Sequence, residues 1–224
     1  MLKVNHSRRR LIFSVGLLTL LGCLALPTFW ATPQALGAPQ PDPIPRRWEL
    51  QVEPGPLRVA SIEVPGEGRR PFFYFTYKVT NLSTGARAGA NQDPYLAPVF
   101  ELYTDDGEII RSGRGVPAPV VRELLARLEN PLLQNEIEIQ GTIKPGKQHA
   151  REGLVVWPAN SMKVDEVVIF AAGFSGETKA VIRPDTGQTI VLRKTLMIRH
   201  RVPGELDPTS SAPLRRGVQR WILR

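Results

Sequence analysis

The chain has 224 residues, with 29 Lys and Arg against 21 Asp and Glu, and therefore a formal net charge of +8. Its 42% hydrophobic and 22% charged residues are globular proportions, which exclude a chain that is disordered throughout. One Cys and three His exclude a disulfide framework and argue against a zinc site with several His or Cys ligands. We therefore expect no metal and no cofactor.

The first 37 residues have the composition of an export signal. They carry four positive charges and no acidic residue, and an apolar run follows the arginines from Leu11 to Leu26. Basic residues stay on the cytoplasmic side of the membrane while the apolar run enters the export machinery. The small residues Ala35 and Gly37 predict cleavage after Gly37. Residues 1–37 are thus predicted to be a signal peptide or membrane anchor, and the protein to be periplasmic or extracellular.

Three variants of this prediction stay open. Arg8, Arg9 and Arg10 resemble a twin-arginine signal, which would export a folded protein, although an ordinary basic region accounts for them too. Cys23 resembles the lipid-accepting Cys of a bacterial lipobox, although Leu21 is bulky for that motif. Residues 11–30, if uncleaved, are just long enough to anchor the protein in a bilayer.

Residues 38–47 alternate proline with other residues, which predicts an extended linker. The exported part contains no Cys, so that it has to be stabilised by core burial alone, which a chain of this length allows. We expect this part to comprise a folded domain over 48–200 and a basic C-terminal tail over 201–224.

The folded part is predicted to consist mainly of strands. The aromatic and β-branched segment 72–80 is the strongest candidate, and Asp105-Asp106-Gly107 predicts a hairpin turn after 99–104. The other candidate strands are 48–53, 57–64, 108–111, 136–143, 153–157, 167–174, 178–183 and 189–199, with a turn expected at Pro54-Gly55-Pro56. Strands and helices do not alternate, which favours an antiparallel β-sandwich over a parallel sheet.

One segment, at about residues 120–130, follows the helical period instead. Val121, Leu124, Leu125 and Leu128 fall on one face of a helix, and Asn130-Pro131 would end it. We therefore expect one short helix, packed over an edge of a sheet or an end of the sandwich.

The order of these pieces resembles that of exported bacterial immunoglobulin-like accessory domains. The segments that carry the likeness are 75–83, 98–107, 141–146 and 153–157, within residues 48–175. The resemblance implies an immunoglobulin-like β-sandwich and an exported location, and it transfers no active site.

No segment presents a recognisable catalytic motif. Residues 141–148 have the Gly and Lys spacing of a phosphate-binding loop, but Gln148 stands where a hydroxyl residue is needed and no helix is predicted to follow, so that a turn is favoured. His149 and His200 are expected at the surface, and the acidic residues around Gly107 in a turn rather than a calcium site. A non-enzymatic binding or structural module of the bacterial cell envelope is therefore predicted. The alternative is an exported carbohydrate-active hydrolase that uses paired carboxylates, for which the sequence singles out no pair.

The C-terminal end carries the positive excess of the exported chain. Residues 193–224 hold eight Lys and Arg and two acidic residues. Arg215, Arg216, Arg220, Trp221 and Arg224 combine positive charge with apolar side chains, which predicts docking onto an anionic lipid surface, an acidic polysaccharide or another envelope protein. The alternative is that this segment folds back as a final strand with its arginines in water. No nucleic-acid partner is expected.

Overall fold

The computed structural model describes residues 38–83 and 93–224 of the chain. The predictions for residues 1–37, including Cys23 and the anchor over 11–30, lie outside the described residues. Residues 38–224 form one compact unit, to which the expected linker and the expected C-terminal tail both belong. The structure is mainly β, with 49% of residues in strands and 8% in helices, which confirms the predicted class. None of the helices in the described part is both long and apolar enough to cross a membrane.

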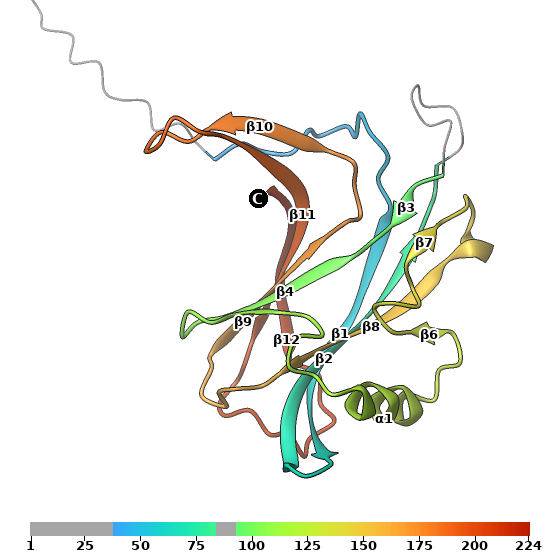
Figure 1. Ribbon diagram of the computed structural model, residues 1–224, viewed down its shortest axis with the longest axis vertical. Coiled ribbons are helices and arrows are strands. Elements are labelled where there is room, and N and C mark those ends of the chain that lie inside the picture. Colours follow the sequence, from blue (N-terminus) through green and yellow to red (C-terminus); the bar gives the residue numbers. More distant parts are fainter. Residues whose placement is uncertain (1–37, 84–92) are drawn as a thin grey trace, which may run out of the picture. The chain divides into compact units, whose positions relative to one another are not determined.

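The first sheet has four strands in the order β1-β2-β8-β6. They are β1 (Gln51–Val64), β2 (Gly68–Thr80), β8 (Arg151–Pro158) and β6 (Leu133–Gln134). β1, β2 and β8 pair antiparallel, whereas the short β6 pairs parallel to β8. Side chains on the outer face of this sheet contact the helix α1, whose coil is labelled in Figure 1.

The second sheet is antiparallel and has the order β10-β11-β9-β4-β5, with a further strand, β12, paired to β11. Its strands are β4 (Val99–Thr104), β5 (Ile109–Arg111), β9 (Glu166–Ala172), β10 (Thr178–Ile182), β11 (Thr189–Arg201) and β12 (Arg215–Leu223). The predicted hairpin at Gly107 is confirmed, because β4 and β5 pair across it. Two small elements complete the unit: the pair β3 (Tyr95–Leu96) and β7 (Gly141–Thr142), and the 3-10 helix η1 (Lys147–His149).

Both sheets contribute side chains to one hydrophobic core. Phe100 of β4 lies near its centre, with its ring centroid 4.9 Å from that of Tyr77, 5.7 Å from that of Phe174 and 6.4 Å from that of Trp157. Such tilted and edge-to-face ring pairs are favourable beyond the area that they bury. Because the chain outside residues 1–37 has no Cys, burial of this shared core has to stabilise it without a disulfide.

The predicted helix is confirmed as α1 (Ala118–Leu128). Val120 and Leu124 are buried against the outer face of the first sheet, and Val121, Leu125 and Leu128 pack around them. The helix begins after Pro117 and ends at Glu129, which adopts a left-handed conformation with φ 49°.

The predicted turn at Pro54-Gly55-Pro56 is wrong. β1 runs through these residues, and its register with β2 shifts between Pro54 and Leu57, which is a β-bulge. β1 is an edge strand and has only one neighbour in its sheet, β2. A proline has no N–H group to donate, and on an edge strand that group can face away from the neighbour, so that no hydrogen bond of the sheet is lost. Gly55 is required by close approach, because a Cβ there would lie 2.6 Å from the carbonyl oxygen of Thr76.

The predicted strand over 136–143 is also wrong for most of its length. The side-chain oxygen of Asn135 accepts hydrogen bonds from the backbone N–H groups of Ile137 and Glu138, and the N–H of Ile139 donates to the carbonyl of Asn135. An Asn side chain that bonds its own downstream backbone stabilises a turn in competition with a strand. Only Gly141 and Thr142 remain extended, as β7.

Candidate functional site

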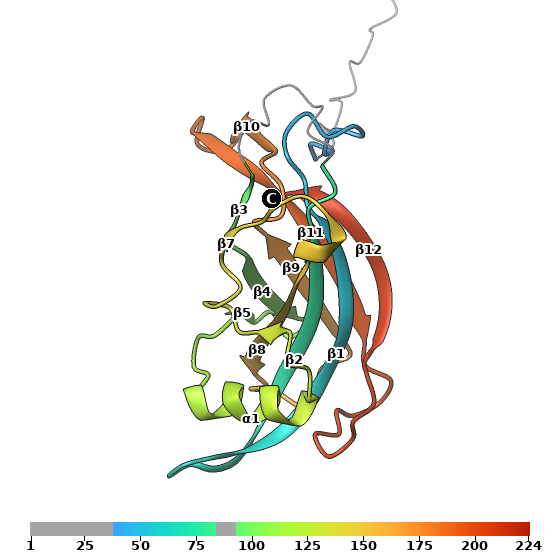
Figure 2. The same cartoon turned by 90° about the vertical axis from the view of Figure 1, so that its right-hand side faces the viewer.

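The C-terminal segment forms a strand rather than a separate tail. β12 pairs antiparallel with the second half of β11, and it appears in Figure 2 as a long red strand along one margin of the unit. The alternative that this segment folds back as a final strand is therefore confirmed. Its pairing fixes each arginine in register with a partner on β11.

Side chains alternate between the core face and the outer face of a strand, so that the register shows on which face each arginine lies. Leu196 and Ile198 of β11 point into the core, so that Arg199 and Arg201 lie on the outer face. Arg220 pairs with Met197 and Arg215 with Arg201, which places both of them on the same outer face. We call Arg201, Arg215 and Arg220 the arginine surface.

The arginine surface carries more positive charge than neighbouring carboxylates offset. Among the described residues, the one carboxylate in register with it is that of Glu166, opposite Arg201 on β9, and it forms its ion pair with Arg199. The three side chains of the arginine surface are exposed and form no ion pair in the part of the chain that the structure describes, which contains every Asp and Glu of the sequence. The two flanking arginines are paired: Arg199 lies 3.4 Å from Glu166, and Arg224 contacts Glu101 and covers the ring of Phe170. The three arginines of this surface are thus left without an ion pair among the described residues.

The other predicted docking residues have structural roles. Arg216 donates to the backbone carbonyls of Pro54 and Gly55, which ties β12 to the bulge of β1. Trp221 is half-buried against the core, and its ring lies 5.5 Å from the ammonium of Lys194. Sequence composition could not separate these residues from Arg215 and Arg220, because only the register reveals which face each of them takes.

Apolar side chains lie among the exposed arginines. Val218 on β12 is 56% exposed, and Ile222 is half-exposed on the outer face, where it pairs with Thr195. The site therefore has exposed aliphatic side chains beside its arginines along β12: Ile222 lies on the same face, and Val218 lies at the register shift between Arg216 and Gln219.

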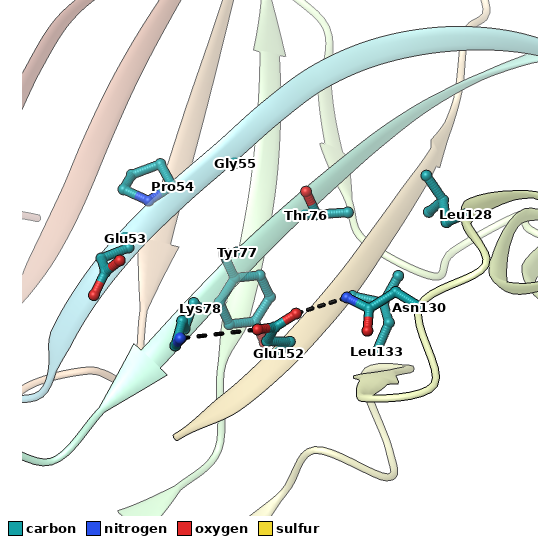
Figure 3. Close-up of a pocket in the computed structure, with 10 residues that line it drawn as sticks. All are labelled: Glu53, Pro54, Gly55, Thr76, Tyr77, Lys78, Leu128, Asn130, Leu133 and Glu152. Atoms are coloured by element: carbon teal, nitrogen blue, oxygen red, sulfur yellow. Dashed lines mark hydrogen bonds and ion pairs between the residues drawn. The ribbon is translucent and has the colours of Figure 1, made fainter. Parts of the chain in front are cut away.

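A second candidate is a pocket of about 360 Å³ on the outer face of the first sheet, shown in Figure 3. Glu53, Lys78 and Glu152 form a row across β1, β2 and β8, because Glu53 is in register with Lys78, and Lys78 with Glu152. The Lys78 ammonium lies 4.0 Å from Glu152, and the side-chain amide of Asn130, just past α1, donates to the same carboxylate at 2.6 Å.

The pocket is lined by two carboxylates, which is the number that paired-acid hydrolysis requires. With strands about 4.8 Å apart, the Cα atoms of Glu53 and Glu152 are separated by roughly 10 Å, and the Lys78 strand lies between them. Glu152 is occupied by Lys78 and Asn130, which is the arrangement of a structural ion pair. The one aromatic ring that lines the pocket, that of Tyr77, is 3% exposed and belongs to the core, so that it offers no stacking platform for a sugar.

The remaining sequence candidates have internal partners or lie apart. His149 is exposed as predicted, but the prediction for His200 is wrong, since its side chain is fully buried. Burial and the nearby charge of Arg216 lower the pKa of His200 to about 4, so that the ring is neutral at pH 7. Asp106 accepts hydrogen bonds from Thr104 and from the backbone of Glu108, which confirms the turn.

Within residues 38–83 and 93–224, no group of three or more His, Cys, Asp or Glu could hold a metal ion. Comparison of the chain with models of known protein families, with curated proteins and with solved structures gives no match.

Proposed function

We propose that this protein is an exported, non-enzymatic module of the bacterial cell envelope, which docks onto an anionic lipid surface through its arginine surface. The observation that carries the proposal is the placement of Arg201 directly opposite Arg215, both exposed and neither in an ion pair among the described residues, while Glu166 on the other side of Arg201 is paired with Arg199. Like charges opposite each other on neighbouring strands destabilise a sheet. An anionic partner would relieve that repulsion.

The chemistry of the surface favours lipid over an acidic polysaccharide. Each Arg or Lys close to an anionic bilayer contributes about 1 kcal/mol to binding, so that three arginines would supply roughly 3 kcal/mol. The aliphatic side chains of Val218 and Ile222 beside them could enter the headgroup region, which a hydrated polysaccharide would not accommodate.

The location and the finer fold are parts of the same proposal. Export rests on the basic and apolar composition of residues 1–37, in which cleavage would follow Gly37. An immunoglobulin-like β-sandwich is supported by two largely antiparallel sheets that share one core and contain no Cys. Retention of residues 11–30 or lipidation of Cys23 would hold the arginine surface near a membrane without changing its chemistry.

The test is co-sedimentation with vesicles of phosphatidylcholine alone or mixed with phosphatidylglycerol. We expect binding only to the anionic vesicles, and weaker binding as salt rises. The variant R201Q/R215Q/R220Q should bind about 100-fold more weakly, following from the 3 kcal/mol above. R114Q/K144Q/K147Q is the matched control, because it removes the same charge from exposed positions elsewhere. Equal loss in both variants, or binding to an acidic polysaccharide in place of vesicles, would reject a lipid-docking role.

The alternative of a carbohydrate-active hydrolase has one observation in its favour, the presence of Glu53 and Glu152 in the same pocket. It predicts release of reducing sugar from an envelope polysaccharide, and loss of that activity in both E53Q and E152Q. Absence of hydrolysis by the unaltered chain would remove this alternative.

A further inference from the structure

A β-hairpin arm extends from the second sheet. It comprises residues 178–193, which are β10, the turn after it and the first part of β11 (Figure 1). Among the described residues, β10 pairs with β11 alone, and residues 189–192 of β11 pair with β10 alone, whereas Arg193 at the base of the arm also exchanges backbone hydrogen bonds with Arg224. The arm is therefore a two-stranded ribbon.

Both faces of the arm expose aliphatic side chains. On one face Ile182 is 71% exposed and Val191 61% exposed, and on the other face Val181, Ile190 and Leu192 are half-exposed. A two-stranded hairpin is marginally stable in water by itself, and contiguous exposed apolar surface marks interaction sites. The arm has the features of an element that is covered in an assembly.

The base of the arm is firmly held. The backbone N–H of Lys194 donates to the carbonyl of Glu177, and the Lys194 ammonium lies 3.0 Å from the Glu177 carboxylate. Lys194 also lies 2.7 Å from Glu49, in the segment that leads into β1. These contacts fix the direction in which the arm leaves the sheet.

The outer edge of β10 presents backbone groups that have no partner within residues 38–83 and 93–224. Glu177 and Arg183 use their backbone groups toward β11, since the carbonyl of Glu177 accepts from Lys194 and the N–H of Arg183 donates to Gln188. Backbone directions alternate along a strand, so that odd-numbered residues of β10 point toward β11. The N–H and C=O groups of Thr178, Ala180 and Ile182 therefore point outward from the sheet edge.

These groups match those of a second copy of the same strand. Antiparallel pairing about a two-fold axis at Ala180 places Ala180 opposite its symmetry mate and Thr178 opposite Ile182 of the other copy, and it satisfies all of the outward groups. Lys179 is the one charged residue of β10, and it falls opposite Val181 rather than another charge. Val191 and Ala180 of both copies then form a continuous aliphatic row across the four strands.

We propose that β10 pairs antiparallel with β10 of a second copy about Ala180, so that the two arms form a four-stranded sheet that joins a symmetric dimer. A bilayer fits the arm less well, because the tip over residues 184–187 is polar and its Arg183–Asp185 ion pair would have to enter the lipid. This dimer does not depend on the arginine surface, which lies on β11 and β12 beyond the arm.

The test is sedimentation velocity of the chain recovered from cells that express the full sequence, over about 1–100 µM, the range of weak dimers. We expect a reversible monomer–dimer equilibrium. A180E and A180K each place two like charges directly opposite each other at an exposed position, and each should weaken dimerisation by at least about tenfold. An equimolar mixture of A180E and A180K should restore dimerisation, because opposite charges then meet on the axis.

The mixture separates pairing at β10 from general damage to the fold, since a misfolded variant would not be rescued by another. I137E is the matched control, because Ile137 is 82% exposed in the turn over 135–140 and lies outside the arm. It should leave the dimer unchanged. A monomer at every concentration, a dimer that A180E does not weaken, or a mixture without rescue would each overturn the proposal.

Discussion

Replacement of Lys194 tests the contacts that stabilise the fold most directly. Its side chain is 4% exposed and lies 2.7 Å from Glu49 and 3.0 Å from Glu177, with the Trp221 ring 5.5 Å away. Its contacts join the segment before β1, the base of the arm and β12. Replacing Lys194 with Met keeps most of the packing volume and leaves two carboxylates without their cation.

The expected loss follows from the burial of the three charges. Removal of one partner from a fully buried ion pair costs about 3–5 kcal/mol. Because Glu49 keeps 25% and Glu177 12% of its side chain exposed, water can compensate in part. We expect K194M to lower the free energy of unfolding by about 2–3 kcal/mol.

Urea unfolding of the wild type, K194M, E177Q and the double variant provides the assay. The two single changes should be non-additive, with a coupling energy of about 1–2 kcal/mol, because both of them remove the same contact. K194M within about 0.5 kcal/mol of wild type, or strict additivity with E177Q, would refute the role of this cluster.

The pH dependence gives a second, independent readout of the same cluster. Burial acts to raise the pKa of Glu177, but the backbone N–H of Asp42 and the side chain of Lys194 outweigh it and lower that pKa. A depressed carboxyl pKa stabilises the fold above the unfolded value near 4.3, and this contribution is lost as pH falls through the folded pKa. The advantage of wild type over K194M should therefore shrink in acid.

At high pH, stability depends on pH in the opposite direction, through the charge of Lys194. Burial acts to lower the pKa of Lys194, but hydrogen bonds and charges from Glu49 and Glu177 outweigh it and raise the pKa. This contribution is present below the unfolded value near 10.4 and is lost as pH rises through the folded pKa.

Three further predictions concern packing and a buried histidine. G153A should lower the free energy of unfolding by about 2 kcal/mol or more, because a Cβ at Gly153 would lie 2.6 Å from Tyr77 Oη in the core. G217A should be close to neutral, because a Cβ at Gly217 would lie 3.5 Å from the nearest atom. Urea unfolding of both variants tests this difference. L124A should cost about 2–4 kcal/mol by opening a cavity under α1, and a loss below about 1 kcal/mol would contradict the packing described. NMR titration should show that the His200 ring stays neutral down to about pH 4. Because the ring of the unfolded chain binds its proton near pH 6.5, the wild type should lose stability relative to H200L as pH falls from about 6.5 to about 4. A ring pKa near 6.5 in the folded protein would refute its burial.

Local sequence patterns predicted those elements in which one pattern of side chains runs through the whole element. The aromatic strand β2, the hairpin of β4 and β5 and the helix α1 all have that property, and each was found at its predicted place. Residues 136–143 alternate like a strand, but the Asn135 side chain offered their backbone a competing turn. Pro54 and Pro56 suggested a turn. The structure accommodates them within β1, because β1 is an edge strand and a bulge lies at this point, and neither feature is evident from the sequence.

The candidate sites depended on information that the sequence does not carry locally. The positive excess of the C-terminal end was evident from composition, but the division of its arginines between exposed and structural roles follows from the register of β12 on β11. Likewise, residues 178–193 read as two ordinary strands. Their exposure on both faces became apparent only from the topology, in which residues 178–182 and 189–192 pair with no third strand of the described chain.

The export of the chain is tested most directly by the mass of its N-terminus after cell fractionation. The account predicts that the protein is recovered from the periplasmic or extracellular fraction and begins at Ala38. Recovery of the intact chain, with residues 1–37 attached, from the cytosol would contradict it.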